Sequence, residues 1–169
     1  MTAARPFPSL RITAEGLFAE GSFAEAQAAF LRPAKDRVEK LDALLIAKKV
    51  GVVAHYYMDP ELQGVLAGCT HPHIHVSDSL VMADRAVAMA QAGMESIVVL
   101  GVDFMSENAR AMLDAAGFAH VPVYRVASDP IGCSLAEAAE APAYGAYLAQ
   151  AAKAKHPLHV VYINTGLRT

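Results

Sequence analysis

Short blocks of helical and strand-like hydrophobic patterning follow one another along the chain. Apolar residues recur at helical spacing in six segments, at 22–31, 35–49, 79–92 and 106–116 and in two stretches that begin at 134 and 143. Continuous or alternating apolar runs predict strands at 50–55, 74–76, 96–100, 121–126 and 159–163. Strands that alternate with helices pair in parallel through right-handed crossovers. The sequence therefore predicts an α/β fold, a three-layer α/β/α unit with a short parallel sheet.

Local signals set several of the expected helix ends. Asp78 is placed to cap the helix that begins at Ser79, and Gly93 is placed to end it. Ser106, with Glu107 beside it, reads as the cap of the next helix, and Gly117 as its end. The residues before the first helix form a frayed terminus or the remnant of an organellar transit peptide.

Composition and charge narrow the classes of partner. The chain is 54% hydrophobic with a net charge of −3, and its isoelectric point is near 6.1 with a mean hydropathy of +0.29. A nucleic-acid-binding or anionic-membrane-binding surface needs a basic patch that this balance does not supply. No run approaches the roughly 20 apolar residues of a membrane span. Two cysteines are too few for a disulfide scaffold and fit a reducing compartment.

Polar residues follow the predicted strands, where ligands of parallel α/β folds bind. They are His55, Tyr56 and Tyr57, then Ser77, Asp78 and Ser79, then Asp103, and finally Asn164. Simpler roles remain open for each. A histidine can hydrogen-bond at a strand end, a serine can cap a helix, and only one of two consecutive tyrosines easily faces the pocket.

The cysteines and the clustered histidines each have a functional and a structural interpretation. Cys133 lies at the start of a predicted helix, where the helix dipole stabilises a thiolate, but single cysteines are also common in cores. His71, His73 and His75 invite a metal site, with His73 and His75 on one strand face, although no third ligand is evident and loop histidines are common. Cys69 in the same loop is more simply incidental.

Five strings in order resemble the quinolinate synthase family: AHYYMDPELQ (54–63), SDSL (77–80), GVDFM (101–105), GCSL (132–135) and VYINT (161–165). The resemblance covers residues 21–169. The loop at 71–75 and the strings VMAD (81–84) and FMSEN (104–108) are most similar to the plant and algal form, which works in plastids. For any other source the expected location is the cytoplasm.

The resemblance implies an activity and a cofactor. The family condenses iminoaspartate with dihydroxyacetone phosphate to give quinolinate for NAD, using a [4Fe-4S] cluster as Lewis acid, in homodimers with three α/β units per chain. It implies that Cys133 is the first of three cluster ligands and that His55, Ser79, Tyr162 and Asn164 bind substrate. Tyr57 then orients the triose-derived intermediate or assists proton transfer, and His55 is also counted with the catalytic groups.

The resemblance also suggests a division of the chain. Residues 1–48 form an N-terminal arm with helices, 49–157 the first α/β unit, and 158–169 the first strand of a second unit. The chain stops before the family's second and third cysteines. We therefore expect it neither to assemble the cluster nor to catalyse the full reaction without the missing C-terminal units, and to expose apolar surface where those units dock.

Two other functions stay open. The chain can be a non-catalytic domain that binds a dicarboxylate or a partner protein, which the missing cysteines favour. It can also be a small metal hydrolase that uses His71, His73 and His75. Binding of a dicarboxylate without iron would favour the former, and stoichiometric zinc binding through the histidines would favour the latter.

Overall fold

The computed structural model describes residues 9–30 and 33–166, which divide between two compact units. The N-terminal unit consists of Met1–Ile46 and Tyr57–Pro72, and the sheet unit consists of Ala47–Tyr56 and His73–Thr169. Among the described residues, no helix is both long and apolar enough to cross a membrane.

The N-terminal unit combines a β-hairpin with three helices. Its elements are β1 (Ser9–Thr13), β2 (Gly16–Glu20), α1 (Ser22–Phe30), α2 (Lys35–Ala47) and α3 (Pro60–Gly68). Helix α3 begins where the Asp59 carboxylate accepts the backbone N–H of Glu61 at 2.8 Å. Gly68 lies so close to the buried Val38 of α2 that an added Cβ would meet a valine methyl at 3.1 Å. The helices α2 and α3 therefore pack tightly at this point.

The hairpin was not predicted. β1 and β2 pair antiparallel with Thr13 opposite Gly16, which has a φ of +140° that favours glycine. The signals were the alternating Leu10 and Ile12 followed by a glycine after a two-residue turn, and they lie in a segment that reads equally well as a frayed terminus. Residues 1–8, the rest of the expected transit-peptide remnant, lie outside the described part of the chain.

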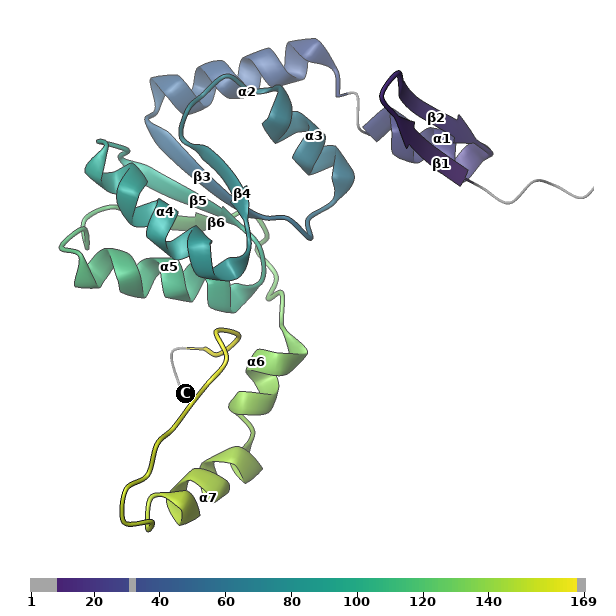
Figure 1. The fold of residues 1–169 in the computed structure, drawn as a ribbon. Helices are drawn as coiled ribbons and strands as arrows, with labels where there is room; N and C mark the ends of the chain where they lie inside the picture. Colours follow the sequence, from purple (N-terminus) through teal and green to yellow (C-terminus); the bar gives the residue numbers. More distant parts are fainter. Residues whose placement is uncertain (1–8, 31–32, 167–169) are drawn as a thin grey trace, which may run out of the picture. The chain divides into compact units, whose positions relative to one another are not determined.

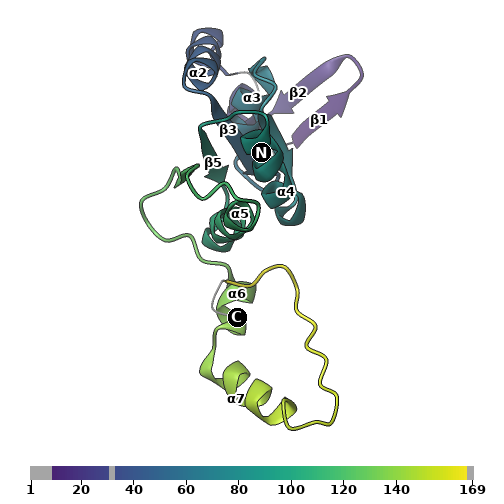
Figure 2. The same cartoon turned by 90° about the vertical axis from the view of Figure 1, so that its left-hand side faces the viewer.

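The sheet unit contains a four-stranded parallel sheet of order β4-β3-β5-β6 (Figure 1). Its strands are β3 (Val50–His55), β4 (Ile74–Ser77), β5 (Ser96–Leu100) and β6 (Val123–Arg125). Its helices are α4 (Ser79–Gln91), α5 (Asp103–Ala115), α6 (Ser134–Ala139) and α7 (Pro142–Ala151). Helices α4 and α5 lie side by side along the sheet (Figures 1 and 2). The predicted α/β class, a parallel sheet flanked by helices, is confirmed.

The core of the sheet unit lies between the sheet and the helices α4 and α5. Val53, Ile97, Ala109 and Leu113 are fully buried there. Gly51 of β3 is tightly enclosed, because an added Cβ would lie 2.8 Å from Met89 Sδ and 2.9 Å from Ile97 Cδ1. Close packing of this kind makes the position of each strand sensitive to single methyl groups.

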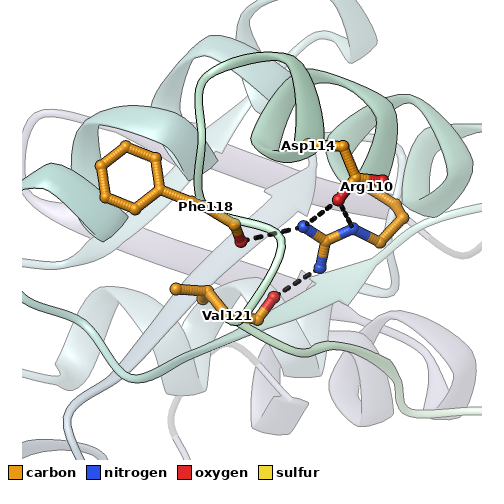
Figure 3. Close-up of polar contacts among 4 residues, drawn as sticks. All are labelled: Arg110, Asp114, Phe118 and Val121. Carbon is orange, nitrogen blue, oxygen red and sulfur yellow. Dashed lines mark hydrogen bonds and ion pairs between the residues drawn. The ribbon is translucent and has the colours of Figure 1, made fainter.

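The connection from α5 to β6 is held by Arg110 (Figure 3). Its guanidinium donates to the carbonyls of Phe118 and Val121, and it pairs with the Asp114 carboxylate at 2.8 Å. These carbonyls belong to the loop between the helix and the strand, so a single side chain replaces the hydrogen bonds that a regular element would provide. Sequence reasoning missed this role of Arg110.

Most predicted boundaries agree with the structure to within one or two residues, but the start of one helix does not. Helix α5 begins at Asp103, not Ser106, and its N-cap Val102 has no side-chain hydrogen bond. The Ser106 hydroxyl donates instead to the Asp103 carbonyl at 2.7 Å, within the helix. The prediction was wrong because Phe104 and Met105, only 3% and 5% exposed, extend the helix into the core.

The predicted strand at 159–163 was also wrong. Among the described residues, nothing pairs with this segment as a strand, and Leu158 and Val160 are 87% and 80% exposed. The segment follows α7 and returns extended toward α6 (Figure 2). An apolar, β-branched run forms a strand only where a neighbouring strand offers hydrogen bonds, so sequence pattern alone overpredicted it here.

Candidate functional site

The strand order places a topological switch point between β3 and β5. From β3 the chain moves outward to β4, and from β5 it moves outward to β6 on the other side. Because connections leave this point in opposite directions, a crevice is expected outside the carboxyl ends of β3 and β5. His55 ends β3, and Asp103 follows β5 by a two-residue turn. Two of the predicted polar positions therefore flank the switch point.

His55 lies at the carboxyl end of the interior strand β3 and is only 8% exposed. Its ring stacks on Tyr56 with centroids 4.8 Å apart and an interplanar angle of 17°. Burial lowers the pKa of His55 below its ordinary value, and the nearby Asp78 carboxylate partly opposes that shift. This shift favours the neutral imidazole, the form in which one ring nitrogen donates a hydrogen bond and the other accepts one.

Ser77, Asp78 and Ser79 stand beside His55 at the end of β4. Ser77 is the register partner of His55, and its carbonyl accepts the backbone N–H of Tyr56 at 3.1 Å. Asp78 caps α4 by accepting the N–H groups of Leu80 and Val81, as the sequence predicted. The capping explanation therefore belongs to Asp78 and leaves the hydroxyls of both serines to other roles.

The two serines differ in their surroundings. The Ser77 hydroxyl donates to the Asp78 carbonyl at 3.0 Å. Ser79 opens α4 and is 9% exposed, and its hydroxyl has no hydrogen-bond partner among the residues that the structure describes. A hydroxyl at a helix N-terminus is well placed to donate to a bound anion.

The tyrosines after β3 lie in different surroundings. Tyr56 stacks on His55 and is 44% exposed, whereas Tyr57 is 79% exposed and belongs to the N-terminal unit. The turn that carries Tyr57 is fixed by Gln63, whose side-chain amide donates to the Met58 carbonyl at 2.8 Å. The backbone of the turn is therefore held in place, while the Tyr57 ring stays accessible to a ligand.

Cys133 lies at the N-cap of α6, with its side chain partly buried against the core. Burial acts to raise the pKa of the thiol and Glu137 adds to that. They are outweighed by hydrogen bonds from the backbone of Ala136 and Leu135 and from the Asn164 amide, so the net pKa is below the ordinary cysteine value. The thiolate is the form that binds metals, and this environment favours the thiolate.

Cys69 shows the opposite behaviour. Its thiol donates to the Val65 carbonyl at 3.4 Å, and burial together with the Asp42 charge raises its pKa. The neighbouring His71 is buried in the N-terminal unit, where its backbone N–H is bound by Asp42. Within the described residues, no group of three or more His, Cys, Asp or Glu side chains is arranged to hold a metal ion. The geometry therefore gives the histidine metal site no support.

The C-terminal segment contributes Asn164 to the same region as Cys133. The Asn164 side-chain amide lies 3.7 Å from the Cys133 sulfur. Tyr162 is 71% exposed. The structure thus brings two of the predicted site residues together across 31 positions of sequence, and it leaves Tyr162 facing solvent.

The carboxylate of Asp103 makes structural contacts with two other parts of the chain. It forms an ion pair with Arg125, and it accepts the backbone N–H of Ile131 at 3.1 Å. Sequence reasoning placed Asp103 at the pocket but missed its partner Arg125. The sequence offered only one hint of this pair, the position of Arg125 near the end of a predicted strand.

The donor set can be tested against the cluster that the sequence resemblance implies. A [4Fe-4S] cluster needs cysteine thiolates, and N–H groups that bond to the sulfur stabilise them. Cys133, with its lowered pKa and the Asn164 amide beside it, fits one such ligand position. Cys133 therefore suits one corner of the cluster, whereas the raised pKa of Cys69 disfavours the thiolate that a second ligand would need.

Comparison with known proteins identifies the family. The sequence model described as "Quinolinate synthetase A protein" matches residues 38–168. The chain is 64% identical to the chloroplastic quinolinate synthase of Nicotiana tabacum, over 96% of this chain and 23% of that protein. The corresponding values for the chloroplastic enzyme of Arabidopsis thaliana are 62%, 97% and 23%. For the quinolinate synthase of Prochlorococcus marinus they are 34%, 67% and 28%.

The chain spans about a quarter of the length of these relatives, and its matches to the plant proteins cover nearly all of it. The family match extends from α2 of the N-terminal unit through the sheet unit to the Asn164 segment. It includes every predicted site residue. The chain belongs to the quinolinate synthase family.

Proposed function

We propose that this chain is part of a plastid quinolinate synthase, a transferase that condenses iminoaspartate with dihydroxyacetone phosphate to form quinolinate for NAD biosynthesis. One observation carries the proposal. In a chain of this family, His55 ends β3, Ser79 opens the helix that follows β4, and Cys133 ends the loop that follows β6, so all three are connected to the carboxyl edge of one parallel sheet. That edge is where α/β folds bind ligands. The names of the plant relatives support the plastid location.

His55 and Ser79 are suited to bind the iminoaspartate carboxylates. The Ser79 hydroxyl donates to one carboxylate at the positive end of α4. Asp78 already occupies the N–H groups of Leu80 and Val81, so the ligand depends on the hydroxyl for its hydrogen bond. The neutral His55 ring donates to the ligand from the adjacent strand, and stacking on Tyr56 fixes its plane.

Tyr57, Tyr162 and Asn164 complete the proposed contacts of this chain. The exposed Tyr57 hydroxyl orients the triose-derived intermediate or passes a proton to it. Tyr162 and Asn164 come from the extended C-terminal segment, and Asn164 sits next to Cys133. Substrate held by Asn164 would therefore lie next to the cysteine sulfur.

Cys133 is proposed to hold one corner of the [4Fe-4S] cluster. When bound, the cluster supplies a Lewis acid for a substrate oxygen. The other thiolates would come from the remaining units of the enzyme, which works as a homodimer. Cys133 acts by presenting a thiolate, and hydrogen bonds from the backbone of α6 and from the Asn164 amide favour that form by lowering the pKa of the thiol.

A hybrid protein tests the proposal. This chain replaces the matching segment of the tobacco relative, and quinolinate formation from iminoaspartate and dihydroxyacetone phosphate is measured. We expect a working enzyme, with Ser79→Ala raising the KM for iminoaspartate at least tenfold because a charge-assisted hydrogen bond is lost. Ser77→Ala is the matched control, since its hydroxyl is bonded within the turn. A folded hybrid that makes no quinolinate would refute the proposal.

The alternative is a non-catalytic domain that binds a dicarboxylate, and the unpartnered Ser79 hydroxyl is the observation in its favour. Calorimetry of the chain alone with a dicarboxylate such as malate separates the two. Tight binding by the iron-free chain, together with a hybrid lacking activity, would select the alternative.

A further inference from the structure

The segment between β6 and α6 carries Cys133 at its end and has no regular structure of its own. Val126 near its start is 70% exposed and Ile131 near its end is 39% exposed, so side-chain packing holds it only weakly. Residues 126–133 are called the cysteine loop below. The position of the Cys133 sulfur depends on whatever fixes this loop.

Asp103 supplies that fixation through its backbone and its side chain together. Its backbone N–H donates to the Ile131 carbonyl at 2.9 Å, and its Oδ1 accepts the Ile131 N–H at 3.1 Å. The same Oδ1 accepts from the Arg125 guanidinium. Arg125 is the last residue of β6 and Ile131 lies two residues before Cys133. One carboxylate oxygen therefore joins both ends of the cysteine loop.

Asp103 is itself rigidly placed. It opens α5, and the next two residues, Phe104 and Met105, are buried in the core. The side chains of Asp103 and Arg125 are 31% and 34% exposed, so water screens their ion pair only in part. The far side of the loop is fixed separately, because Ala136 of α6 is buried in the same core.

We propose that Asp103, held by Arg125, is a positioning residue that fixes the cysteine loop and so sets where the Cys133 sulfur lies. Its importance for cluster binding rests on the proposed function, whereas the clamp itself does not. A substrate-binding role for Asp103 is less favoured, because its carboxylate is already engaged by a guanidinium and a backbone N–H.

Amide hydrogen exchange in the full chain tests the clamp. Asp103→Ala should speed exchange of the Ile131 N–H about tenfold to a hundredfold, the range for loss of a charge-assisted hydrogen bond. Asp103→Asn keeps an acceptor oxygen in place and should restore most of the protection. Arg125→Met should give an intermediate rate, and Asp103→Ala combined with it should be no faster than Asp103→Ala alone, because the pair acts as one unit.

Asp114→Ala is the matched control, since Asp114 is on the same helix and also pairs with an arginine but has no bond to the cysteine loop. It should leave Ile131 exchange at the wild-type rate. Wild-type exchange in Asp103→Ala, or equal acceleration in Asp114→Ala, would overturn the proposal.

The hybrid enzyme adds a spectroscopic readout. Asp103→Ala should lower the cluster's visible absorption per folded chain at least severalfold, and Asp103→Asn should recover it. Unchanged absorption in a folded Asp103→Ala hybrid would overturn the role in cluster placement. If a Cys133→Ser hybrid still shows the full cluster signal, the proposed function fails, while the exchange result at Ile131 still decides the clamp.

Discussion

Arg110 offers the sharpest test of the energetics of the sheet unit. Replacing it with methionine keeps the apolar stem and removes the guanidinium. The change deletes two charged hydrogen bonds, to the carbonyls of Phe118 and Val121, and the ion pair with Asp114. Hydrogen bonds from charged groups contribute about 1.5–3 kcal/mol each, and such neighbouring terms are not additive. A surface ion pair contributes about 0.3–0.5 kcal/mol, which suits a pair whose Asp114 side chain is 52% exposed.

We therefore expect Arg110→Met to lower the free energy of unfolding by about 2–4 kcal/mol. With a urea m-value of about 2 kcal/mol/M, the unfolding midpoint should fall by about 1–2 M in urea titrations followed by circular dichroism. Arg110→Lys should be intermediate, because one ammonium cannot reach all three partners. Asp114→Ala is the control and should cost about 0.5 kcal/mol. The reasoning would be refuted by an Arg110→Met midpoint within about 0.3 M of wild type, or by an equal shift for Asp114→Ala.

Four further outcomes are expected. Iodoacetamide should modify Cys133 much faster than Cys69 near pH 7.5, because the two pKa shifts have opposite directions; equal rates in peptide mass mapping would contradict this. The pKa of His55 is lowered in the folded state, so the free energy of unfolding should fall as the pH drops below the unfolded pKa of about 6.5. His55→Gln should lessen that loss. An NMR titration midpoint for His55 at or above about 6.5 would count against this prediction. Hydrogen bonding from Thr70 lowers the pKa of Asp42, so its contribution is complete above an unfolded value of about 3.9 and is lost as pH falls through the lower folded pKa. Asp42→Asn should flatten acid unfolding over that range, and an unchanged acid profile would argue against the contact. Gly51→Ala should destabilise by about 1–3 kcal/mol, since the new methyl enters a filled space between Met89 and Ile97; a neutral urea midpoint would show that the site relaxes.

The sequence predicted the sheet unit well because its signals are local. The strands at 50–55 and 96–100 match the structure residue for residue, as unbroken apolar runs bounded by turns should. Asp78 and Gly93 act as the predicted cap and stop, since the hydrogen bonds that define each helix end are local. The features that were missed depend on distant partners. The strand expected at 159–163 needed a neighbour, and Ser106 was taken for a cap because core packing at Phe104 could not be seen.

The candidate site divides along the same line. His55, Ser79 and Cys133 were found because they lie at a strand end or at helix starts, positions that the pattern reveals. The ion pair of Asp103 with Arg125 joins residues that are 22 positions apart, and no rule of sequence spacing predicts such a contact. Likewise, the lowered pKa of Cys133 depends partly on Asn164. The fold brings Asn164 next to Cys133 although the two residues are 31 positions apart in the sequence.

The most direct test of the account is whether Cys133 is a ligand of the cluster. Anaerobic reconstitution of the tobacco hybrid, followed by iron analysis and Mössbauer spectroscopy, measures this. The account predicts one [4Fe-4S] cluster per hybrid chain, its loss or marked depletion in Cys133→Ser, and its full retention in Cys69→Ser, whose thiol has a raised pKa. A complete cluster in Cys133→Ser, or its loss only in Cys69→Ser, would contradict the account.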